Sequence, residues 1–385
     1  IKPINIKSEA VDAVRSSLTA AVKRHLVADV PVGVFLSGGI DSSILAAVAA
    51  DFAGGERVHT LSTIFDESEF SEKKYQDIIV QNIKSNHLEL LLKENDFVAA
   101  LPDIFDAYDQ PSVDGINTFF ISRFASNNGL KVALSGIGSD ELMGGYNSFM
   151  PNLPLNILRS LPKSLHRFWR LHPNVKFKKL EYLSIPNELQ HYLFYRSNFA
   201  PSVISKILDI SEQEIYNKLE YFWLKNNNLS SLFELTSKLE QDFYMQGQLL
   251  KDTDYMSMWN SLEIRVPYLD SKFLQIVNAI SPSLKSKNIT KKEILVEAFI
   301  DKIPKEVWNR PKKGFSLPFQ KWMKNKFLED QMMQVKNPEI QKLSLLFNSG
   351  KLHWSRYWTL YLLEHFSKSK NSGVKKSANI EMSFV

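Results

Sequence analysis

The sequence predicts an α/β fold in which a parallel sheet carries helices on both faces and is followed by a mostly helical lobe. Short apolar, β-branched runs alternate with stretches of helical spacing through residues 1–150. Two of these runs end in loops of glycine, serine and aspartate. Beyond Tyr146 the strand-like runs stop, while apolar residues continue at helical spacing. Because strands that alternate with helices form parallel sheets, we expect the sheet in the first part of the chain.

The first predicted element is an amphipathic helix over residues 8–26, where Val14, Leu18 and Val22 lie four residues apart. Further on, β-branched and apolar runs predict four buried strands with helices between them. The predicted strands begin at Val32 and cover 58–65, 87–92 and 131–134, and the predicted helices cover 44–50, 72–84, 97–108 and 119–124.

We predict three segments along the 385 residues, a length that exceeds the ~100–200 residues typical of one domain. Residues 1–150 form the α/β core. Residues 151–366 form a helical lobe that completes the site, with helical spacing at 232–250 and 291–300. Residues 367–385 are polar and rich in lysine and serine, so we expect a disordered tail.

The composition excludes several classes of protein. Hydrophobic residues make up 44% and charged residues 23%, as in ordinary globular proteins. The longest apolar runs fall short of the ~20 residues that cross a bilayer, and no signal-peptide pattern opens the chain. We therefore expect a cytoplasmic protein with no membrane partner. The absence of cysteine excludes disulfides, thiolate metal sites and cysteine nucleophiles.

The formal net charge of +5 is small and spread along the chain. Its densest stretch, Lys163 to Lys179, interleaves basic and aromatic residues, a pattern that fits a nucleic-acid or membrane surface as well as a solvated helical face. We favour the solvated face and predict no nucleic-acid partner.

A loop that suits phosphate follows the first predicted strand. Residues Val32–Ser43 read Val-Gly-Val-Phe-Leu-Ser-Gly-Gly-Ile-Asp-Ser-Ser, a strand, a tight turn and a helix start. The glycine pair allows a tight turn with exposed N–H groups, and the helix start adds its positive dipole end. The lysine of a Walker A loop is missing.

A second loop of this kind follows the fourth predicted strand, where residues 135–146 read Ser-Gly-Ile-Gly-Ser-Asp-Glu-Leu-Met-Gly-Gly-Tyr. Two parallel strands thus deliver acidic loops to one edge of the sheet. Asp41 and Asp140 are candidate Mg²⁺ ligands, since Mg²⁺ prefers one or two carboxylates beside phosphate oxygens. A helix-capping role is the alternative for Asp140.

The first loop resembles that of the PP-loop ATP pyrophosphatases, a Rossmann-like family that splits ATP between the α and β phosphates. With the second loop, the sequence resembles the synthetase domain of glutamine-hydrolysing asparagine synthetase and the related β-lactam synthetase-like amide ligases. Three later stretches agree with this resemblance, namely Asp254–Met258 running into Leu262–Asp270, Lys292–Leu295, and Arg310-Pro311-Lys312-Lys313-Gly314-Phe315.

The resemblance implies roles for individual residues. ATP and Mg²⁺ are the implied ligands, with Asp41 and Asp140 on the metal. Lys292 would neutralise the α phosphate, although without the motif it would read as a solvated helix lysine, and Asp254 would act as a base. The implied nucleotide contacts are Leu36, Ser37, Gly38, Gly39, Asp41, Ser42, Thr63, Ser135 and Gly136.

The sequence departs from the family pattern at three points. Ile137 stands where family members usually carry an acidic residue, and Val296 stands where an arginine often follows the Lys-x-x-Leu motif. The glutaminase domain that usually comes first, with its nucleophilic cysteine, is absent from this stretch of sequence. We expect either a fragment of a longer enzyme, since the chain begins with Ile1, or a stand-alone ligase.

The resemblance implies an amide ligase that adenylates a carboxylate, aspartate by default, and then amidates it with ammonia to give asparagine. The ammonia would come from a glutaminase domain or subunit, and a homodimer is among the expectations. Amidation or ring closure of a different acid is one alternative. A catalytically inactive nucleotide-binding module is another. Transfer RNA thiolation is disfavoured because that chemistry needs cysteine.

Overall fold

A computed structural model describes residues 2–53, 57–150, 153–224, 231–287, 292–314 and 316–371. The chain divides into two compact units. Unit 1 comprises Ile1–Tyr108, Asp114–Tyr146 and Glu240–Pro318, and unit 2 comprises Asp109–Val113, Asn147–Leu239 and Phe319–Val385. The division differs from the predicted boundary at residue 150, because a stretch from the second half of the chain packs with the α/β core.

Unit 1 contains a five-stranded sheet in the order β3-β2-β1-β4-β5, and all neighbouring strands are parallel. This confirms the predicted α/β class. The strands are β1 (Val32–Phe35), β2 (His59–Ile64), β3 (Asn86–Leu91), β4 (Val132–Leu134) and β5 (Glu263–Arg265).

The fifth strand corrects the expectation that strands end before Tyr146. In β5, Ile264 pairs with Ala133 of β4. Backbone hydrogen bonds extend the pairing at both ends, from the Glu263 N–H to the Lys131 carbonyl and from the Ser135 N–H to the Arg265 carbonyl. This strand is too short to show a pattern of its own, so its pairing partner defines it.

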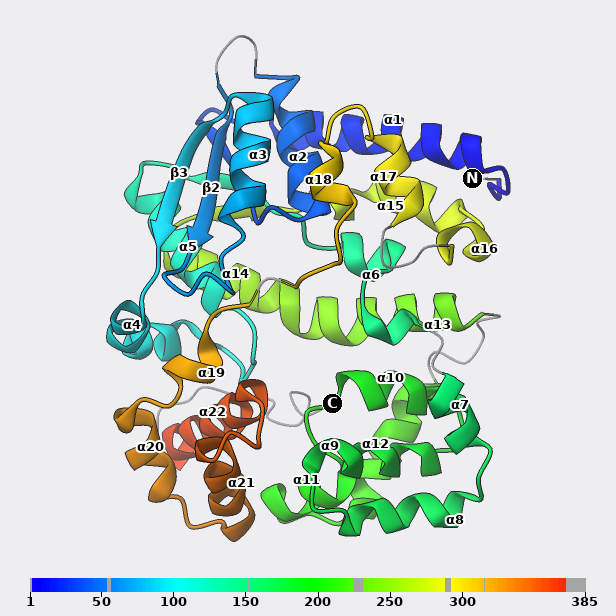
Figure 1. Cartoon of the computed structure of the whole chain (residues 1–385), viewed down its shortest axis with the longest axis vertical. Coiled ribbons are helices and arrows are strands. Elements are labelled where there is room, and N and C mark those ends of the chain that lie inside the picture. Colours follow the sequence, from blue (N-terminus) through cyan, green and yellow to red (C-terminus); the bar gives the residue numbers. More distant parts are fainter. Residues whose placement is uncertain are drawn as a thin grey trace. The chain divides into compact units, whose positions relative to one another are not determined.

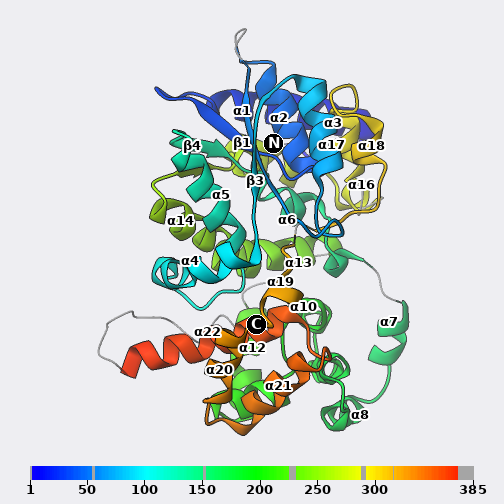
Figure 2. The same ribbon diagram turned by 60° about the vertical axis from the view of Figure 1, so that its left-hand side comes forward.

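Helices cover both faces of the sheet, as Figures 1 and 2 show. On one face Val34 packs in a cluster with Ile44 of α2 (Ile40–Ala50) and Ile79 of α3 (Lys73–Ile83). On the other face Leu61 packs with Ile121 of α5 (Ile116–Asn127). The remaining helices of unit 1 are α1 (Lys7–His25), α4 (Glu94–Ala107), α6 (Ser139–Met143), η4 (Glu240–Leu249), α14 (Leu250–Trp259), η5 (Pro267–Leu269), α15 (Ser271–Ala279), α16 (Pro282–Lys285), α17 (Glu293–Ala298) and α18 (Lys305–Trp308).

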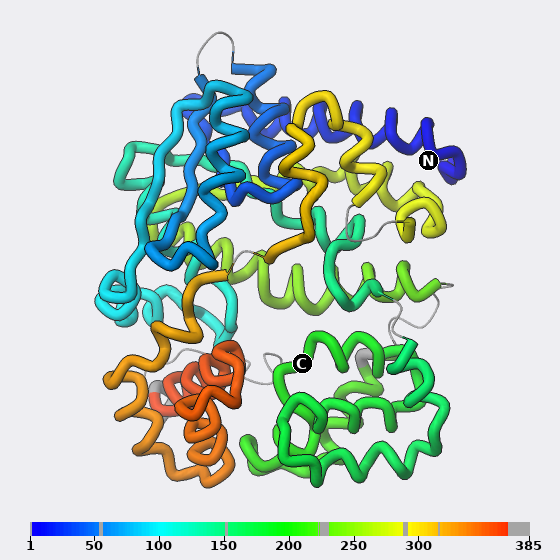
Figure 3. Tube along the Cα trace, in the orientation of Figure 1, coloured from blue at the N-terminus to red at the C-terminus, as the bar shows by residue number. Residues whose placement is uncertain are grey.

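The first helix lies beside segments almost three hundred residues away, which the tube in Figure 3 makes easy to follow. Lys7 of α1 forms ion pairs with Glu293 and Glu297. Arg15 pairs with Asp301 at 2.6 Å and also donates to the Ala298 carbonyl. These contacts hold α17, together with Lys292 just before it, against the core.

The regular secondary structure described in unit 2 is helical, as the sequence predicts, with turns and loops between the helices. Aromatic stacking contributes to its core, since the centres of the stacked Phe347 and Tyr357 rings lie 4.1 Å apart. Its helices are η1 (Asn147–Phe149), α7 (Leu153–Arg159), α8 (Lys163–His166), η2 (Arg167–Leu171), α9 (Val175–Lys178), η3 (Lys179–Ser184), α10 (Leu189–Arg196), α11 (Pro201–Leu208), α12 (Glu212–Leu224), α13 (Leu232–Leu239), α19 (Phe319–Trp322), α20 (Lys326–Met333), α21 (Pro338–Asn348) and α22 (Trp354–Asn371).

Three of the predictions fall partly on residues that the structure does not describe. Helix α22 continues to Asn371, so the predicted disordered tail is wrong for residues 367–371, and residues 372–385 lie outside the described residues. Lys291 of the helix predicted at 291–300, and Phe315 of the quoted motif, also lie outside them. Within the described part of the chain, no helix is both long enough and apolar enough to span a bilayer.

Lys179 of η3 corrects the prediction of a fully solvated basic face and gives a stability test. Its side chain is buried, and its ammonium donates to the Tyr195 carbonyl at 3.3 Å. Burial, with a smaller effect from the Arg356 charge, lowers the pKa of Lys179 to about 7. Between this value and the ordinary 10.5, the folded chain binds fewer protons than the unfolded chain, so stability should rise with pH.

We therefore expect Lys179→Met to raise the unfolding free energy at pH about 7 and to have a much smaller effect at pH about 10. Denaturant unfolding at the two pH values measures this, with the exposed Lys305→Met as the control. An equal effect of Lys179→Met at both pH values would contradict the assignment.

Candidate active site

The candidate site lies where the order in which strands are added to the sheet reverses. Strands β2 and β3 lie on one side of β1, whereas β4 and β5 lie on its other side. In parallel α/β sheets, ligands bind outside the carboxyl ends of the strands at such a switch point. The two predicted loops, Leu36–Gly39 after β1 and Ser135–Gly138 after β4, lie at this point.

Glycine allows the two loops to approach each other closely. A Cβ atom at Gly136 would lie 3.2 Å from the Asp41 Cβ and 3.3 Å from the Ser42 nitrogen. Gly38 has φ +80°, and a Cβ there would lie 3.2 Å from the Tyr75 Cβ. Larger residues would push the second loop away from α2 and strain the first loop.

Hydroxyl groups brace the first loop at the start of α2. Ser37 and Ser42 share a hydrogen bond of 3.0 Å between their Oγ atoms, and the Gly39 N–H donates to Ser37 Oγ. Among the residues that the structure describes, no side chain caps α2, whose N-cap residue is Gly39. The first-turn N–H groups therefore remain available to an anion.

A charge cluster around the buried Lys292 joins the two loops to a third segment. The Lys292 ammonium lies 2.6 Å from Asp41 Oδ1, 2.5 Å from Asp140 Oδ1 and 3.0 Å from Ser139 Oγ. Ser139 Oγ also donates to Asp41 Oδ1 at 2.7 Å. Lys292 is 4% exposed and has φ +47°, a left-handed conformation that costs a lysine roughly 1–2 kcal/mol. Strain of this kind concentrates at functional positions.

The cluster favours the charged forms of Lys292 and Asp140. Burial opposes the charge on Lys292, but Asp140 and Asp41 outweigh it, so the pKa of Lys292 lies above its ordinary value. Burial likewise opposes the charge on Asp140, and Lys292 and Lys312 outweigh it, so the pKa of Asp140 lies below its ordinary value. Lys292 therefore supplies a permanent positive charge at the meeting point of the loops.

These groups line a cavity of about 330 Å³ in unit 1, within the size range of ligand sites. The cavity brings together most of the residues that the sequence singled out for nucleotide, metal and catalysis. They are Leu36, Ser37, Gly39, Asp41, Ser42, Thr63, Ser135, Gly136, Asp140 and Lys292.

Two predicted site residues do not line the cavity. Gly38 contributes its backbone, since its carbonyl accepts a hydrogen bond from Arg310 at 3.0 Å. Asp254 lies on α14 with its side chain exposed, because the buried face of that helix carries Thr253, Met256 and Ser257. Asp254 therefore places no group in the cavity where the predicted base would act.

Sequence reasoning assigned no role to several residues that the structure brings to the cavity. Glu141 and Tyr146 belong to the quoted second loop, and the Tyr146 hydroxyl donates to Glu141 Oε1 at 2.6 Å. Burial, with the neighbouring Asp140 charge, raises the pKa of Glu141 to about 7. Arg310, Lys312 and Lys313 also line the cavity. The sequence signal that could have identified them is the cluster of basic residues in the motif 310–315.

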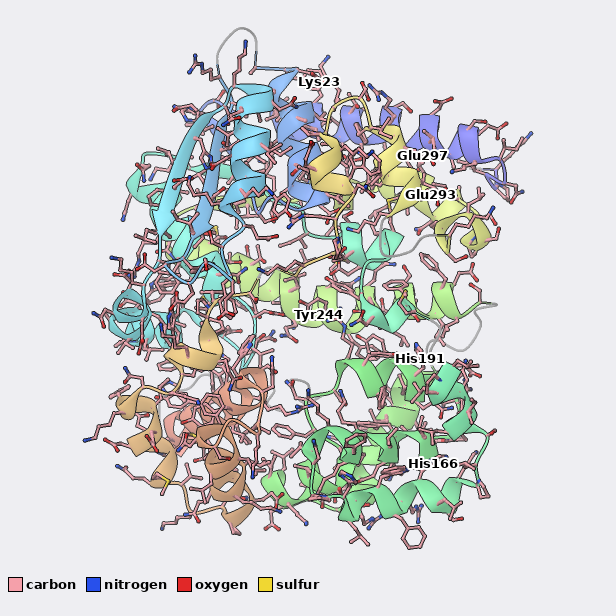
Figure 4. The ribbon with its side chains drawn as sticks, viewed as in Figure 1. Lys23, His166, His191, Tyr244, Glu293 and Glu297 are labelled. Atoms are coloured by element: carbon pink, nitrogen blue, oxygen red, sulfur yellow. The ribbon has the colours of Figure 1, made fainter. Side chains whose placement is uncertain are left out.

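Tyr244, labelled in Figure 4, reaches the cavity from η4, and its ring meets the Tyr146 ring edge-on at 5.9 Å. The stretch 232–250, for which the spacing predicts helix, is helical throughout in α13, η4 and the start of α14. Its middle part, η4, is π-helical rather than α-helical. π-helical turns are rare and often mark functional sites.

The donor set suits a divalent cation that also contacts phosphate. Asp41 and Asp140 each place an oxygen on the same Lys292 nitrogen, so the two carboxylates converge where one cation fits. Among the described residues, no group of three or more acidic or histidine side chains could hold a metal unaided. One or two carboxylates completed by phosphate oxygens and water are a usual ligand set of Mg²⁺.

Comparison with known proteins gives a consistent result. The family model described as asparagine synthase matches residues 13–357. Glutamine-hydrolyzing asparagine synthetase 1 of Bacillus subtilis (strain 168) is 30% identical over 338 residues, which cover 85% of this chain and 53% of that protein. A putative asparagine synthetase of Mycobacterium bovis is 29% identical over 329 residues, covering 81% and 49%. Amidase chyE of Penicillium rubens is 26% identical over 365 residues, covering 82% and 53%. The chain spans about half the length of the curated relatives it matches.

Proposed function

The chain belongs to the asparagine synthase family, and on that premise we propose that it is an ATP-dependent amide ligase. In the proposed reaction a substrate carboxylate attacks the α phosphorus of ATP, which forms an acyl-adenylate and releases pyrophosphate. Ammonia then attacks the acyl carbon and AMP leaves. The adenylate replaces hydroxide, a poor leaving group, with a good one. Aspartate is the proposed acid, asparagine the product, and a glutaminase domain or subunit the source of ammonia.

The convergence of Asp41 and Asp140 on Lys292 at the switch point carries this proposal. The first-turn N–H groups of α2, with Ser37 and Ser42, would hold the phosphates that leave. Lys292 would stabilise the negative charge that develops at the α phosphorus. Asp41 and Asp140 would hold Mg²⁺, which supplies charge neutralisation and orientation for the triphosphate.

Product analysis tests the proposal. The chain is incubated with Mg-ATP, ammonium and aspartate whose carboxylates carry a heavy oxygen isotope, and we expect AMP and pyrophosphate in equal amounts. One labelled oxygen should appear in AMP, since the carboxylate oxygen that attacks phosphorus stays with it. ADP and phosphate as products would overturn the proposal, and nucleotide binding without turnover of any acid would favour the inactive binding module.

Ile137 favours a second candidate, a ligase of the same type that acts on another acid. It lines the cavity at the position where the family pattern places a carboxylate. An isoleucine there offers an apolar surface and no proton acceptor. A panel of acids distinguishes the candidates, because the second requires pyrophosphate release with an acid other than aspartate and none with aspartate.

A further inference from the structure

Large apolar side chains face solvent along residues 153–171 of unit 2, here called the 153–171 surface. This segment comprises α7, α8 and η2, and Figures 1 and 2 show α7 and α8 at the periphery of unit 2. The exposed apolar side chains, with exposures from 42% to 76%, are Leu153, Ile157, Leu161, Leu165, Phe168 and Leu171. Exposed apolar side chains that gather in this way mark interaction sites far more often than single exposed ones do.

Helical geometry places these side chains opposite the core of unit 2. Leu165, Phe168 and Leu171 are three residues apart, and in a 3₁₀ helix such as η2 residues three apart lie above one another. Trp169 of η2 instead packs against a core cluster that contains Leu155 of α7. Both segments therefore keep one apolar face in the core and turn a second apolar face outwards.

The charges on and beside the 153–171 surface are positive. Every charged residue from Leu142 to Leu180 is basic, although aspartate and glutamate number 42 in the 385 residues of the chain. Two of these arginines are neutralised from other helices, Arg159 by Glu188 and Arg170 by Glu212. Lys163, Arg167 and Lys176 are exposed, and they form no ion pair with any residue that the structure describes. The surface therefore offers unpaired cations beside exposed apolar side chains.

We propose that the 153–171 surface binds a membrane that carries anionic lipid headgroups. The apolar side chains would enter the interface between headgroups and acyl chains, and Lys163 and Arg167 would contact the headgroups. This is attachment to one face of a bilayer, so it needs no membrane-spanning helix. It revises the sequence-based expectation of no membrane partner, which considered the length of apolar runs. The proposal goes beyond the ligase activity and does not depend on it.

Two other occupants suit the 153–171 surface less well. In a symmetric dimer, a second copy of the chain would present the same surface and bring its unpaired cations against each other. Single-stranded nucleic acid is bound by basic grooves with aromatic side chains on which bases stack. All the exposed apolar side chains of this surface except Phe168 are aliphatic. Aliphatic side chains beside cations match a lipid interface better than either alternative.

Sedimentation of the chain with lipid vesicles tests the contribution of the apolar side chains. We expect binding to vesicles of phosphatidylcholine and phosphatidylglycerol in equal amounts, and much weaker binding to phosphatidylcholine alone. Phe168→Ser combined with Leu171→Ser should weaken binding at least roughly 10-fold, because both side chains leave water when bound. Phe327→Ser, which removes a half-exposed phenylalanine of α20, should bind like wild type. Circular dichroism checks that the variants are folded.

The same assay tests the contribution of the cations. Lys163→Gln combined with Arg167→Gln should weaken binding to the anionic vesicles roughly 20-fold, since each basic residue near such a surface contributes about fivefold. The variant should also lose most of the salt dependence of binding. Lys305→Gln, which removes an exposed lysine of α18 in unit 1, is the matched control and should bind like wild type.

A spin label shows whether the surface enters the lipid. The chain contains no cysteine, so Leu171→Cys introduces a single site for a nitroxide. We expect anionic vesicles to shield this label from a water-soluble relaxation agent in electron paramagnetic resonance. A label at Phe327→Cys should stay accessible.

The following outcomes would overturn the proposal. The first is a wild-type chain that does not bind anionic vesicles, and the second is binding that the Phe168→Ser and Leu171→Ser pair leaves unchanged. The third is self-association in analytical ultracentrifugation that this pair abolishes, which would identify a second copy as the occupant. The fourth is tighter binding to single-stranded RNA than to anionic vesicles at the same salt concentration. Product analysis in solution remains the separate test of the ligase activity, so failure of one proposal is distinguishable from failure of the other.

Discussion

Replacing Lys292 with methionine is expected to lower turnover by roughly 10³-fold, the upper range for one preorganised group that stabilises developing charge. Methionine keeps the length and much of the volume of the side chain but removes the charge between Asp41 and Asp140. Because the proposed phosphate contacts of Ser37, Ser42 and the first-turn N–H groups of α2 do not involve Lys292, nucleotide affinity should change much less than turnover. Pyrophosphate release under saturating ATP measures turnover. Calorimetry with an ATP analogue that has a methylene group between the α and β phosphorus atoms measures nucleotide affinity.

The fold must be checked in the same experiment, because Lys292→Met leaves two carboxylates close together in a buried site. Removing one partner of a buried pair costs about 3–5 kcal/mol, although Lys312 remains on Asp140 and should lessen this loss. Circular dichroism and denaturant unfolding report whether the chain is folded under assay conditions. Lys302→Met, which removes an outlying ion pair with Asp51, is the matched control. A folded Lys292→Met protein with wild-type turnover would remove Lys292 from the mechanism.

The parts of the site that the sequence predicts are those encoded by short continuous stretches. Each loop carries its own pattern of glycine and hydroxyl residues. Gly136 is required because the second loop passes close to Asp41, and Gly38 because the first loop passes close to Tyr75. The neighbouring positions of the two loops then follow from the parallel arrangement of β1 and β4. Sequence patterns fail where contacts between distant residues decide the structure. β5 is defined by its pairing with β4, and Arg310 by contacts with residues far earlier in the chain.

Two residues show how a local pattern misleads in opposite directions. Spacing alone presents Lys292 as a solvated lysine, yet it is buried because carboxylates from two other loops surround it. Asp254 belongs to a motif that matches the family, yet the periodicity of α14 turns its side chain away from the buried face. Burial and helix face, which depend on tertiary packing, decide between these cases.

Replacing Asp41 with asparagine is expected to lower turnover at least roughly 10²-fold while the chain stays folded. Asparagine matches the shape of aspartate, and its amide oxygen can still accept from Ser139 Oγ. It lacks the negative charge that a divalent cation requires from a carboxylate ligand. Asp140 remains to neutralise Lys292, so the buried lysine keeps a counter-charge and the loss of stability should be modest.

Asp41→Asn separates metal binding from positioning when two measurements are combined. Binding of Mn²⁺ in the presence of the ATP analogue, followed by electron paramagnetic resonance, should weaken, and added Mg²⁺ should recover part of the turnover. Asp51→Asn, at the other end of α2, should change neither quantity. If Asp41 acts only by holding Lys292 in place, Mn²⁺ affinity will be unchanged. In that case Asp41→Asn combined with Lys292→Met should be no slower than Lys292→Met alone. That result would leave the carboxylate a structural role and remove Asp41 from the proposed metal site.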